Sequence, residues 1–268
     1  MAKVKSNNAT ITTRFSLKNE KNFFIEILIL QFASKNIYLH EFLSINGMTK
    51  LRLVFKVEEE TLFDNKFSIK HDMLNHIAMV LSNVRNSEND VILVTAGAIA
   101  SGVGQLNLKR YPKDLSDKQA MAAIGQVELI KSYQNIFDEY TQMTAQVLLA
   151  RDLFNNSKQQ YNAKNTFKKL LSLGVIPVIN ENDTISTADI EMEDNYTLTV
   201  TVAHIISAHA VIQVNKDFSF NVLCAGKNHS LFCKDKDGLF KLISDMSKKA
   251  ISHRTYPDTF PTETKIYE

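Results

Sequence analysis

The chain has 268 residues, of which 44% are hydrophobic and 22% are charged, so it can form a sizeable apolar core. Thirty-one Lys and Arg against 29 Asp and Glu give a net charge of +2, which lacks the concentrated positive charge of a nucleic-acid-binding domain. Two cysteines cannot form a disulfide framework and are typical of a reducing compartment, so we expect a cytoplasmic protein. Eight glycines, against roughly nineteen at average usage, predict that any Gly-rich phosphate loop is minimal.

The first 47 residues are expected to form an extension that precedes the folded domain. Their first half is basic and contains several Ser and Thr, which is loosely like a transit peptide; a disordered extension is the interpretation that composition favours. No apolar run approaches the roughly twenty residues that span a bilayer, so no membrane segment is predicted. The sequence predicts one folded domain from residue 48 onward.

From residue 48, apolar runs that are typical of buried strands alternate with segments of helical periodicity. This alternation predicts an α/β fold, a three-layer α/β/α sandwich with a mostly parallel central sheet. The expected strands are 51–57, 91–94, 146–150, 175–179 and 210–214, and the expected helices are 67–84, 117–140, 162–173 and 197–208. A turn with three glycines is expected after residue 94.

Polar segments follow several of these strands, at the edge where parallel sheets bind ligands. Residues 180–184 read Asn-Glu-Asn-Asp-Thr, and Asp194 and Asn195 open a later helix. Such groups can bind a zwitterion, because carboxylates accept hydrogen bonds from ammonium and amides satisfy a carboxylate. They are also common in ordinary turns and helix caps, which is the alternative interpretation. Lys56, at the end of the first strand, could reach a phosphate or extend to the surface.

Five sequence segments, in this order and spacing, carry a family resemblance. They are VILVTAGAIASG at 91–102, AAIGQ at 122–126, AQVLLARD at 145–152, NAKNT at 162–166 and GVIPVINENDT at 174–184. Together they closely resemble the amino acid kinase family and, within it, the glutamate 5-kinases. The resemblance extends over roughly residues 48–214, and the NENDT loop with the downstream Asp-Asn pair is its most specific part.

The resemblance implies an α/β/α fold and an enzyme that uses ATP and Mg²⁺ to phosphorylate the γ-carboxylate of L-glutamate, the first step toward proline. It implies that Lys56 is the catalytic lysine that contacts the ATP phosphates. It also implies that Asp183 and Asn195 bind glutamate and that Ala96 and Gly97 form the turn beside it. A homo-oligomer is expected, with no nucleic-acid or membrane partner and no protein-bound metal site.

The chain departs from the family pattern at several of these positions. Glu58, Glu59 and Glu60 replace the small residues of the first phosphate loop, where they oppose phosphate binding by charge and bulk. Ala96 replaces a serine, and Tyr196 replaces an aspartate. These departures leave a catalytically inactive homologue that binds glutamate or an active partner subunit as the alternative. A kinase for another acid or nucleoside monophosphate is disfavoured by the NENDT loop.

The family's nucleotide-facing motif has two candidate matches. Without a gap it falls on Asn215 and Lys216, whereas residues 234–240 (KDKDGLF) match its sequence better. We expect the later match, which makes Asp235 and Asp237 the nucleotide-binding candidates. No Gly-rich segment with a downstream lysine follows, so the kinase domain of residues 48–268 is expected to be incomplete at its C-terminal end.

Overall fold

The computed structural model describes residues 49–150, 156–185, 195–227 and 230–249. The chain divides into two units, Met1–Met48 and Thr49–Glu268, and only the second contains described residues. The expected extension at 1–47 therefore lies outside the described residues, and its boundary stays a prediction.

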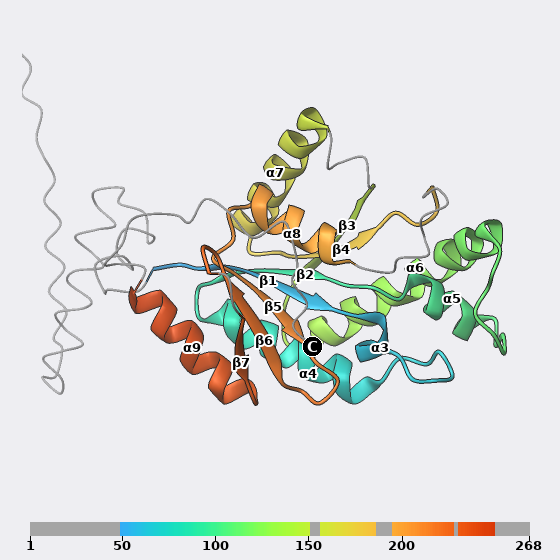
Figure 1. The fold of residues 1–268 in the computed structure, drawn as a ribbon, viewed down its shortest axis with the longest axis horizontal. Helices are drawn as coiled ribbons and strands as arrows, with labels where there is room; N and C mark the ends of the chain where they lie inside the picture. Colours follow the sequence, from blue (N-terminus) through green and yellow to red (C-terminus); the bar gives the residue numbers. More distant parts are fainter. Residues whose placement is uncertain (1–48, 151–155, 186–194, 228–229, 250–268) are drawn as a thin grey trace, which may run out of the picture. The chain divides into compact units, whose positions relative to one another are not determined.

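A seven-stranded sheet forms the centre of this unit, with the strand order β3-β4-β2-β1-β5-β6-β7 (Figure 1). The first five strands in sequence are parallel, and β6 and β7 extend the sheet beyond β5 as antiparallel neighbours. The mostly parallel sheet predicted from the sequence is confirmed. The strands are β1 (Arg52–Val57), β2 (Asp90–Val94), β3 (Thr144–Leu149), β4 (Ile176–Glu181), β5 (Ala210–Val214), β6 (Phe220–Cys224) and β7 (Leu231–Cys233).

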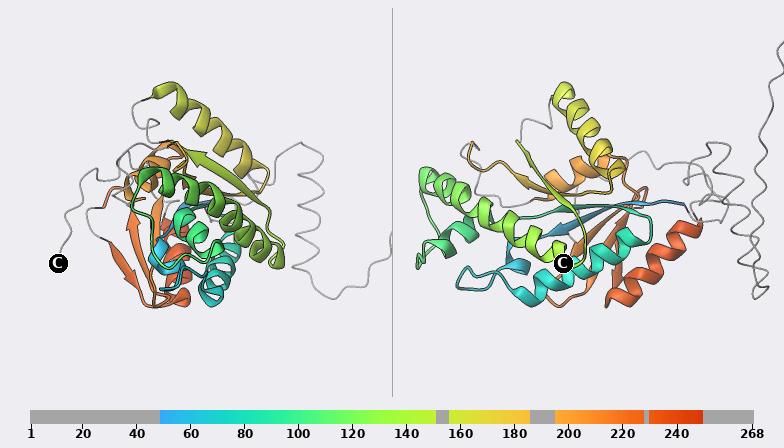
Figure 2. Two further views of the ribbon diagram at one scale, coloured as in Figure 1. Left: turned by 90° about the vertical axis from the view of Figure 1, so that its right-hand side faces the viewer. Right: turned by 180° about the vertical axis from the view of Figure 1, so that it is seen from behind.

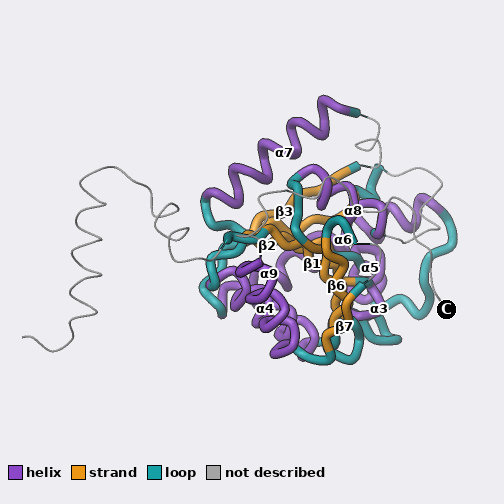
Figure 3. Tube along the Cα trace, turned by 60° about the vertical axis from the view of Figure 1, so that its left-hand side comes forward, coloured by secondary structure: helices purple, strands orange, loops and turns teal. Residues whose placement is uncertain are grey.

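Helices cover both faces of the sheet, which gives the expected α/β/α sandwich. Figures 1 and 3 place α7 and α8 on one face and α4 and α9 on the other, and the view from behind in Figure 2 shows α6 on the same side as α4. None of the described helices is both long and apolar enough to cross a membrane. The helices are α3 (Glu59–Leu62), α4 (His71–Asn86), α5 (Ala98–Gln105), α6 (Leu115–Glu139), α7 (Ser157–Ser172), α8 (Tyr196–Ile205) and α9 (Lys236–Lys249).

Each face of the sheet carries its own apolar core. The larger one joins the sheet to α4, α5, α6 and α9 and contains the fully buried Phe55, Tyr133 and Phe137. The smaller one joins the sheet to α7 and α8 around Phe167 and Val202. Because both faces are covered, the central strands read as continuous apolar runs in the sequence.

Several predicted boundaries differ from the structure, among them the start of α7, which lies at Ser157 and not at residue 162. The helix expected from residue 67 begins at His71, because Phe67 has a left-handed φ of 61° and the Asp64 carboxylate accepts hydrogen bonds from the backbone N–H groups of Lys66 and Ser68. The segment after β2, expected as a glycine-rich turn, is instead the helix α5, which begins directly after Gly97.

The glycines of α5 and α6 allow these helices to approach closely. A Cβ atom on Gly125 would lie 1.9 Å from the Ala98 carbonyl oxygen, and one on Gly102 would lie 2.1 Å from that of Met121. Both contacts involve backbone, which cannot move aside cheaply. Gly102, one of the three glycines expected to form a turn, therefore serves helix packing, and this packing holds α5 at the end of β2.

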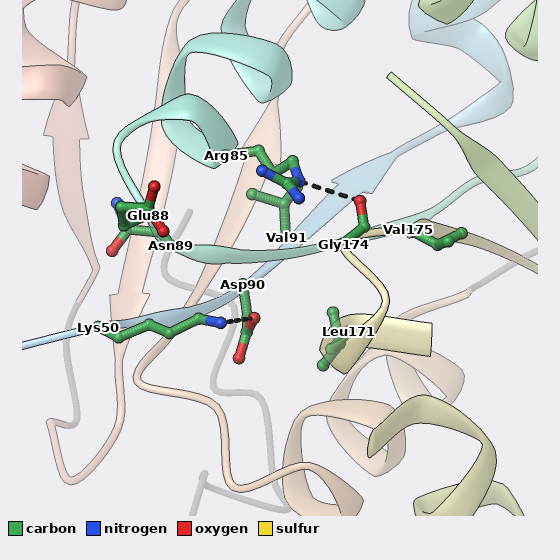
Figure 4. Close-up of a pocket in the computed structure, with 9 residues that line it drawn as sticks. All are labelled: Lys50, Arg85, Glu88, Asn89, Asp90, Val91, Leu171, Gly174 and Val175. Carbon is green, nitrogen blue, oxygen red and sulfur yellow. Dashed lines mark hydrogen bonds and ion pairs between the residues drawn. The ribbon is translucent and has the colours of Figure 1, made fainter. Parts of the chain in front are cut away.

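The amino ends of the strands meet at the opposite edge of the sheet, shown in Figure 4. There Lys50 and Asp90 form an ion pair with an N–O distance of 2.6 Å, and the Arg85 guanidinium donates to the Gly174 carbonyl at 3.1 Å. The ion pair joins the segment before β1 to the start of β2, and the hydrogen bond joins α4 to the segment before β4. We therefore interpret the polar groups of this edge as structural.

Candidate active site

The carboxyl ends of β4, β2, β1 and β5 lie side by side at one edge of the sheet, because these strands are parallel and adjacent. A pocket at this edge, here called the strand-end pocket, is lined by Glu59, Ala96, Gly97, Ala98, Ile99, Tyr111, Asn180, Glu181, Asp183 and Asn195. Residues from the Asn-Glu-Asn-Asp loop and from the start of α8 therefore border the same pocket, as the sequence predicts. Asp194 lies outside the described residues.

A hydrogen bond to the backbone at the end of β2 fixes the side chain of Asn195. Its side-chain amide Nδ2 donates to the Thr95 carbonyl oxygen at 2.8 Å, and Asn195 is only 8% exposed. The Thr95 hydroxyl is in turn 2.8 Å from the hydroxyl of Tyr133, whose pKa is raised by complete burial. Because the Asn195 Nδ2 is engaged, its Oδ1 is the atom that remains for a ligand. Among the described residues, that oxygen has no hydrogen-bond partner.

Asn180 is held in the same way from another element. Its Nδ2 donates to the Oε1 of Gln126 on α6 at 2.8 Å, and Asn180 is 3% exposed. Its Oδ1, too, lacks a partner within the part of the chain that the structure describes. With the carboxylates of Glu181 and Asp183, this side of the pocket is rich in hydrogen-bond acceptors. An ammonium group is the natural ligand of such a surface.

The first turn of α5 faces the same pocket. Gly97, Ala98 and Ile99 line it, and the N–H groups of a first helical turn have no partner within their helix. Gly97 precedes this turn with a left-handed φ of 101°, and a Cβ atom there would lie 2.3 Å from the Phe63 ring. A helix N-terminus binds anions, so this wall suits a carboxylate.

Lys56 lies at the end of β1 and is 5% exposed. Its ammonium group forms an ion pair with Glu58 at 2.6 Å and lies 5.4 Å from the centre of the Tyr196 ring. Two of the residues that depart from the family pattern therefore contact the one residue expected to hold a phosphate. In this structure the Glu58 carboxylate is an anion that pairs with Lys56.

A more open hollow of about 610 Å³ lies on the other side of Glu59. This volume is in the range of ligand sites, about 300–1,000 Å³. Lys216 pairs with Glu60 there, which lowers the pKa of the Glu60 carboxyl, and hydrogen bonds from Ser219 lower the pKa of Asp217. We call it the Glu58–Glu60 hollow; its lining residues are Glu58, Glu59, Glu60, Thr61, Gln213, Asn215, Lys216 and Asp217.

The two matches to the nucleotide-facing motif occupy different places. Asn215 and Lys216 directly follow β5 and line the Glu58–Glu60 hollow. Asp235 precedes α9, where its carboxylate accepts a hydrogen bond from the backbone N–H of Gly238 at 2.9 Å, and Asp237 lies in the first turn. Because β7 is three strands from β1, this segment is roughly 14 Å away along the sheet. The geometry therefore brings the ungapped match, and not the preferred one, to the hollow.

Two residues of the site escape the sequence analysis. Tyr111 reaches the strand-end pocket from the connection between α5 and α6, and no local pattern points to it. Gln126 does have a signal: it lies between Ala122 and Leu129 at helical spacing, so it is a polar residue on the buried face of α6. A buried amide in that position needs a partner, which is Asn180.

The described residues contain no group of three His, Cys, Asp or Glu side chains that could hold a metal ion. Cys224 and Cys233 are buried free thiols whose pKa values are raised by burial.

Comparison with known proteins assigns the chain to a family. The sequence pattern of the amino acid kinase family matches residues 57–216. This range includes every strand end that borders the strand-end pocket. The chain belongs to the amino acid kinase family. The fold described above, with its parallel sheet between two helical layers, is the fold expected from that membership.

Several relatives of this chain share the name glutamate 5-kinase. The chain is 43% identical over 162 residues to the glutamate 5-kinase of Caldanaerobacter subterraneus subsp. tengcongensis, covering 60% of this chain and 44% of that protein. It is 40% identical over 161 residues to that of Clostridium acetobutylicum, covering 60% of each. The match thus spans less than two thirds of either relative. A solved structure, the UMP kinase from Ureaplasma parvum, is 16% identical, with a TM-score of 0.41 over 62% of this chain and 70% of that one.

Proposed function

We propose that this member of the amino acid kinase family is a glutamate 5-kinase, which transfers the γ-phosphoryl group of ATP to the γ-carboxylate of L-glutamate. The observation that carries the proposal is the strand-end pocket, where Asp183 and Asn195 border the same space as the first turn of α5. The names of the relatives support the same reaction. A cytoplasmic location and a homo-oligomeric assembly remain predictions.

The pocket offers complementary groups to an amino diacid. The Oδ1 atoms of Asn180 and Asn195 and the Asp183 carboxylate accept hydrogen bonds from the α-ammonium group. The backbone N–H groups at the start of α5 bind a carboxylate. Ala96 gives one hydroxyl donor fewer than a serine would, so the helix N-terminus provides a larger share of carboxylate binding.

The phosphoryl transfer itself requires no general base from the protein. A carboxylate is ionised at neutral pH, so it attacks the γ-phosphorus without a general base, and ADP leaves as the P–O bond to it breaks. The protein contributes by positioning the two reactants and by neutralising charge. Lys56 is the buried cation at the strand ends that can neutralise the transferred group.

The residues beside Lys56 fit Mg-ATP only in part. The lysine suits a phosphate, but Glu58 already pairs with it, and Glu59 borders both the strand-end pocket and the Glu58–Glu60 hollow. Phosphate must therefore displace one carboxylate and approach two more. Bound Mg²⁺ supplies positive charge that offsets this repulsion. We expect weak nucleotide affinity and a high KM for ATP.

A second function is favoured by the same ion pair. If Glu58 keeps Lys56 in the presence of nucleotide, the chain is a non-catalytic homologue that binds L-glutamate or an active partner subunit. The Tyr196 ring beside Lys56 favours the same function, because it stands where the family resemblance expects a carboxylate.

The decisive experiment measures product. Purified full-length protein is incubated with L-glutamate and Mg-ATP, and γ-glutamyl phosphate is trapped as its hydroxamate with hydroxylamine. Formation that depends on both substrates and is lost in Lys56→Met supports the kinase. Binding of L-glutamate without product supports the non-catalytic homologue. A protein that neither binds L-glutamate nor forms product contradicts both.

A further inference from the structure

Gln126 has an unusual environment for a buried amide. It is 8% exposed, and its Oε1 accepts the hydrogen bond from Asn180, but its own Nε2 is buried without a partner among the described residues. Buried polar groups are almost always hydrogen-bonded, so an orphaned NH₂ group in a native site needs an explanation. The role of Gln126 in orienting Asn180 provides one.

The two amides restrict each other's orientation. An amide oxygen only accepts and an amide NH₂ only donates, so the Gln126 oxygen must face the Asn180 NH₂ group. Asn180 can turn its NH₂ group toward the pocket only if Gln126 turns as well. The orientation of Gln126 therefore decides whether the strand-end pocket receives an oxygen or an NH₂ group from Asn180.

We propose that Gln126 is a positioning residue that keeps the Asn180 oxygen facing the strand-end pocket, where it accepts a hydrogen bond from the α-ammonium group of the ligand. This inference rests on the proposed function. Asn195 supports it independently, because its NH₂ group is also engaged by the protein, on the Thr95 carbonyl. Both asparagines thus offer oxygens, and the pocket selects an amino diacid over a diacid that lacks the amine.

The consequence is testable with two ligands that differ only at that group. L-Glutamate carries the α-ammonium group, and glutarate does not. Titration calorimetry on the full chain is expected to show that Gln126→Ala weakens L-glutamate binding by about tenfold, the size of one lost hydrogen bond to a charged group, and leaves glutarate binding unchanged. The matched control is Gln134→Ala, an exposed glutamine on the same helix, which should change neither.

A double substitution separates positioning from packing. Asp in place of Asn180 presents an oxygen to the pocket whichever way its side chain turns. In an Asn180→Asp background, Gln126→Ala should therefore lower the affinity for L-glutamate by less than about twofold. Gln126→Met keeps the side-chain volume and should behave like Gln126→Ala. If Gln126→Ala fails to fold, Gln126→Met takes its place in every measurement.

The outcomes distinguish the inference from the function on which it rests. If the wild-type chain binds L-glutamate but Gln126→Ala and Gln126→Met bind it equally well, the positioning role is wrong and the proposed function stands. Equal losses for L-glutamate and glutarate also overturn the positioning role, because they indicate general damage to the pocket. A wild-type chain that binds neither ligand overturns both proposals.

Discussion

The strand-end pocket and the Glu58–Glu60 hollow lie next to each other at the same sheet edge, yet their polar groups are engaged differently. In the strand-end pocket, Asn180 and Asn195 use their NH₂ groups on protein acceptors and keep their oxygens for a ligand. In the Glu58–Glu60 hollow, two of the lining carboxylates are paired with lysines, Glu58 with Lys56 at the end of β1 and Glu60 with Lys216. One half is arranged to receive a ligand, whereas in the other half the cations are paired within the protein.

We infer from this difference that the two halves of the proposed active site can change independently. The amino-acid half depends on amides anchored in α6 and in the turn after β2, which are parts of the core. The phosphate half depends on a short segment that follows β1, where a few substitutions change the local charge without disturbing the sheet. The following predictions test whether the two halves are independent, beginning with the largest expected effect.

The first prediction removes the packing that supports the amino-acid half. Gly125→Ala places a Cβ atom 1.9 Å from the Ala98 carbonyl and 2.2 Å from the Gly102 backbone nitrogen, so α5 must move away from α6. We expect a loss of about 1–3 kcal/mol or more in the free energy of unfolding, measured by urea denaturation, together with weaker L-glutamate binding.

The matched control for that substitution is Gly238→Ala. A Cβ atom there meets only ordinary contacts, 3.4 Å from the Asp235 carboxylate, in the first turn of α9. It should leave stability unchanged or raise it by about 0.4–1 kcal/mol. Equal effects of the two substitutions would contradict the close-approach account of α5 and α6.

The second prediction concerns Asp183 in the strand-end pocket. Asp183→Asn removes the carboxylate but keeps the shape, so L-glutamate affinity should fall roughly tenfold to a hundredfold, as for a lost charge-assisted hydrogen bond. Mg-ATP affinity should not change if the halves are independent. Calorimetric titration with each ligand measures both, and a parallel loss for the nucleotide would show that the halves are coupled.

The third prediction removes one partner, the Glu58 carboxylate, from the lysine of the phosphate half. Glu58→Gln removes the carboxylate that pairs with Lys56, so nucleotide affinity should rise by about tenfold while L-glutamate affinity stays constant. A triple substitution, with Gly at Glu58 and small residues at Glu59 and Glu60, should raise the nucleotide affinity further. Glu60→Gln alone is the control: Glu60 is exposed and pairs with Lys216, so its effect should be smaller. An unchanged nucleotide dissociation constant in Glu58→Gln would argue against Lys56 as a phosphate ligand.

The smallest expected effect concerns His209, at the amino ends of the strands. It should change the stability of the chain but not ligand binding in either half. Burial lowers the pKa of His209, whose Nδ1 accepts a hydrogen bond from the Arg52 backbone N–H at 2.9 Å. The unfolded chain therefore binds more protons than the folded one, so His209 contributes its full stability above about pH 6.5 and loses it as the pH falls toward the lowered pKa. Burial gives His76 a pKa shift of the same sign.

The test is the pH dependence of urea unfolding. His209→Asn keeps an acceptor oxygen for the Arg52 N–H but does not titrate, so the fall in stability between pH 6.5 and 5.5 should be shallower than in the wild type. A wild-type chain whose stability is flat over that range would show that the folded and unfolded chains bind equal numbers of protons. An Asn variant with an identical slope would show that His209 is not the responsible group.

Much of the fold follows from the sequence because each layer repeats one simple pattern. Four of the five parallel strands, β1, β2, β4 and β5, are largely buried and so are near-continuous apolar runs, which locates β1, β2 and β5 to within a residue or two. The helix α5 escapes the prediction because Gly97, Gly102 and Gly104 indicate a turn, whereas Gly102 lies inside the helix where it permits contact with α6, and Gly104 lies inside it where the Phe67 carbonyl approaches. That reason involves a second helix, which local patterns do not reveal.

The site was predictable where it depends on strand ends and was not where it depends on partners distant in sequence. Asp183 and Asn195 line one pocket, as expected, because the ends of parallel strands meet. The Lys56–Glu58 pair was not anticipated, since the glutamates suggested repulsion of a ligand and not capture of the lysine. Gln126 and Asn180 are 54 residues apart, so only the fold brings their amides together.

The central claim is that the amino-acid half is ready to bind and the phosphate half is held by Glu58, and one set of titrations tests it most directly. The wild-type chain and Glu58→Gln are each titrated calorimetrically with L-glutamate and, separately, with Mg-ATP. The account predicts that the wild type binds L-glutamate at least about tenfold more tightly than Mg-ATP, and that Glu58→Gln narrows this gap by tightening Mg-ATP alone. A wild type that binds Mg-ATP as tightly as L-glutamate, or that does not bind L-glutamate, would contradict it.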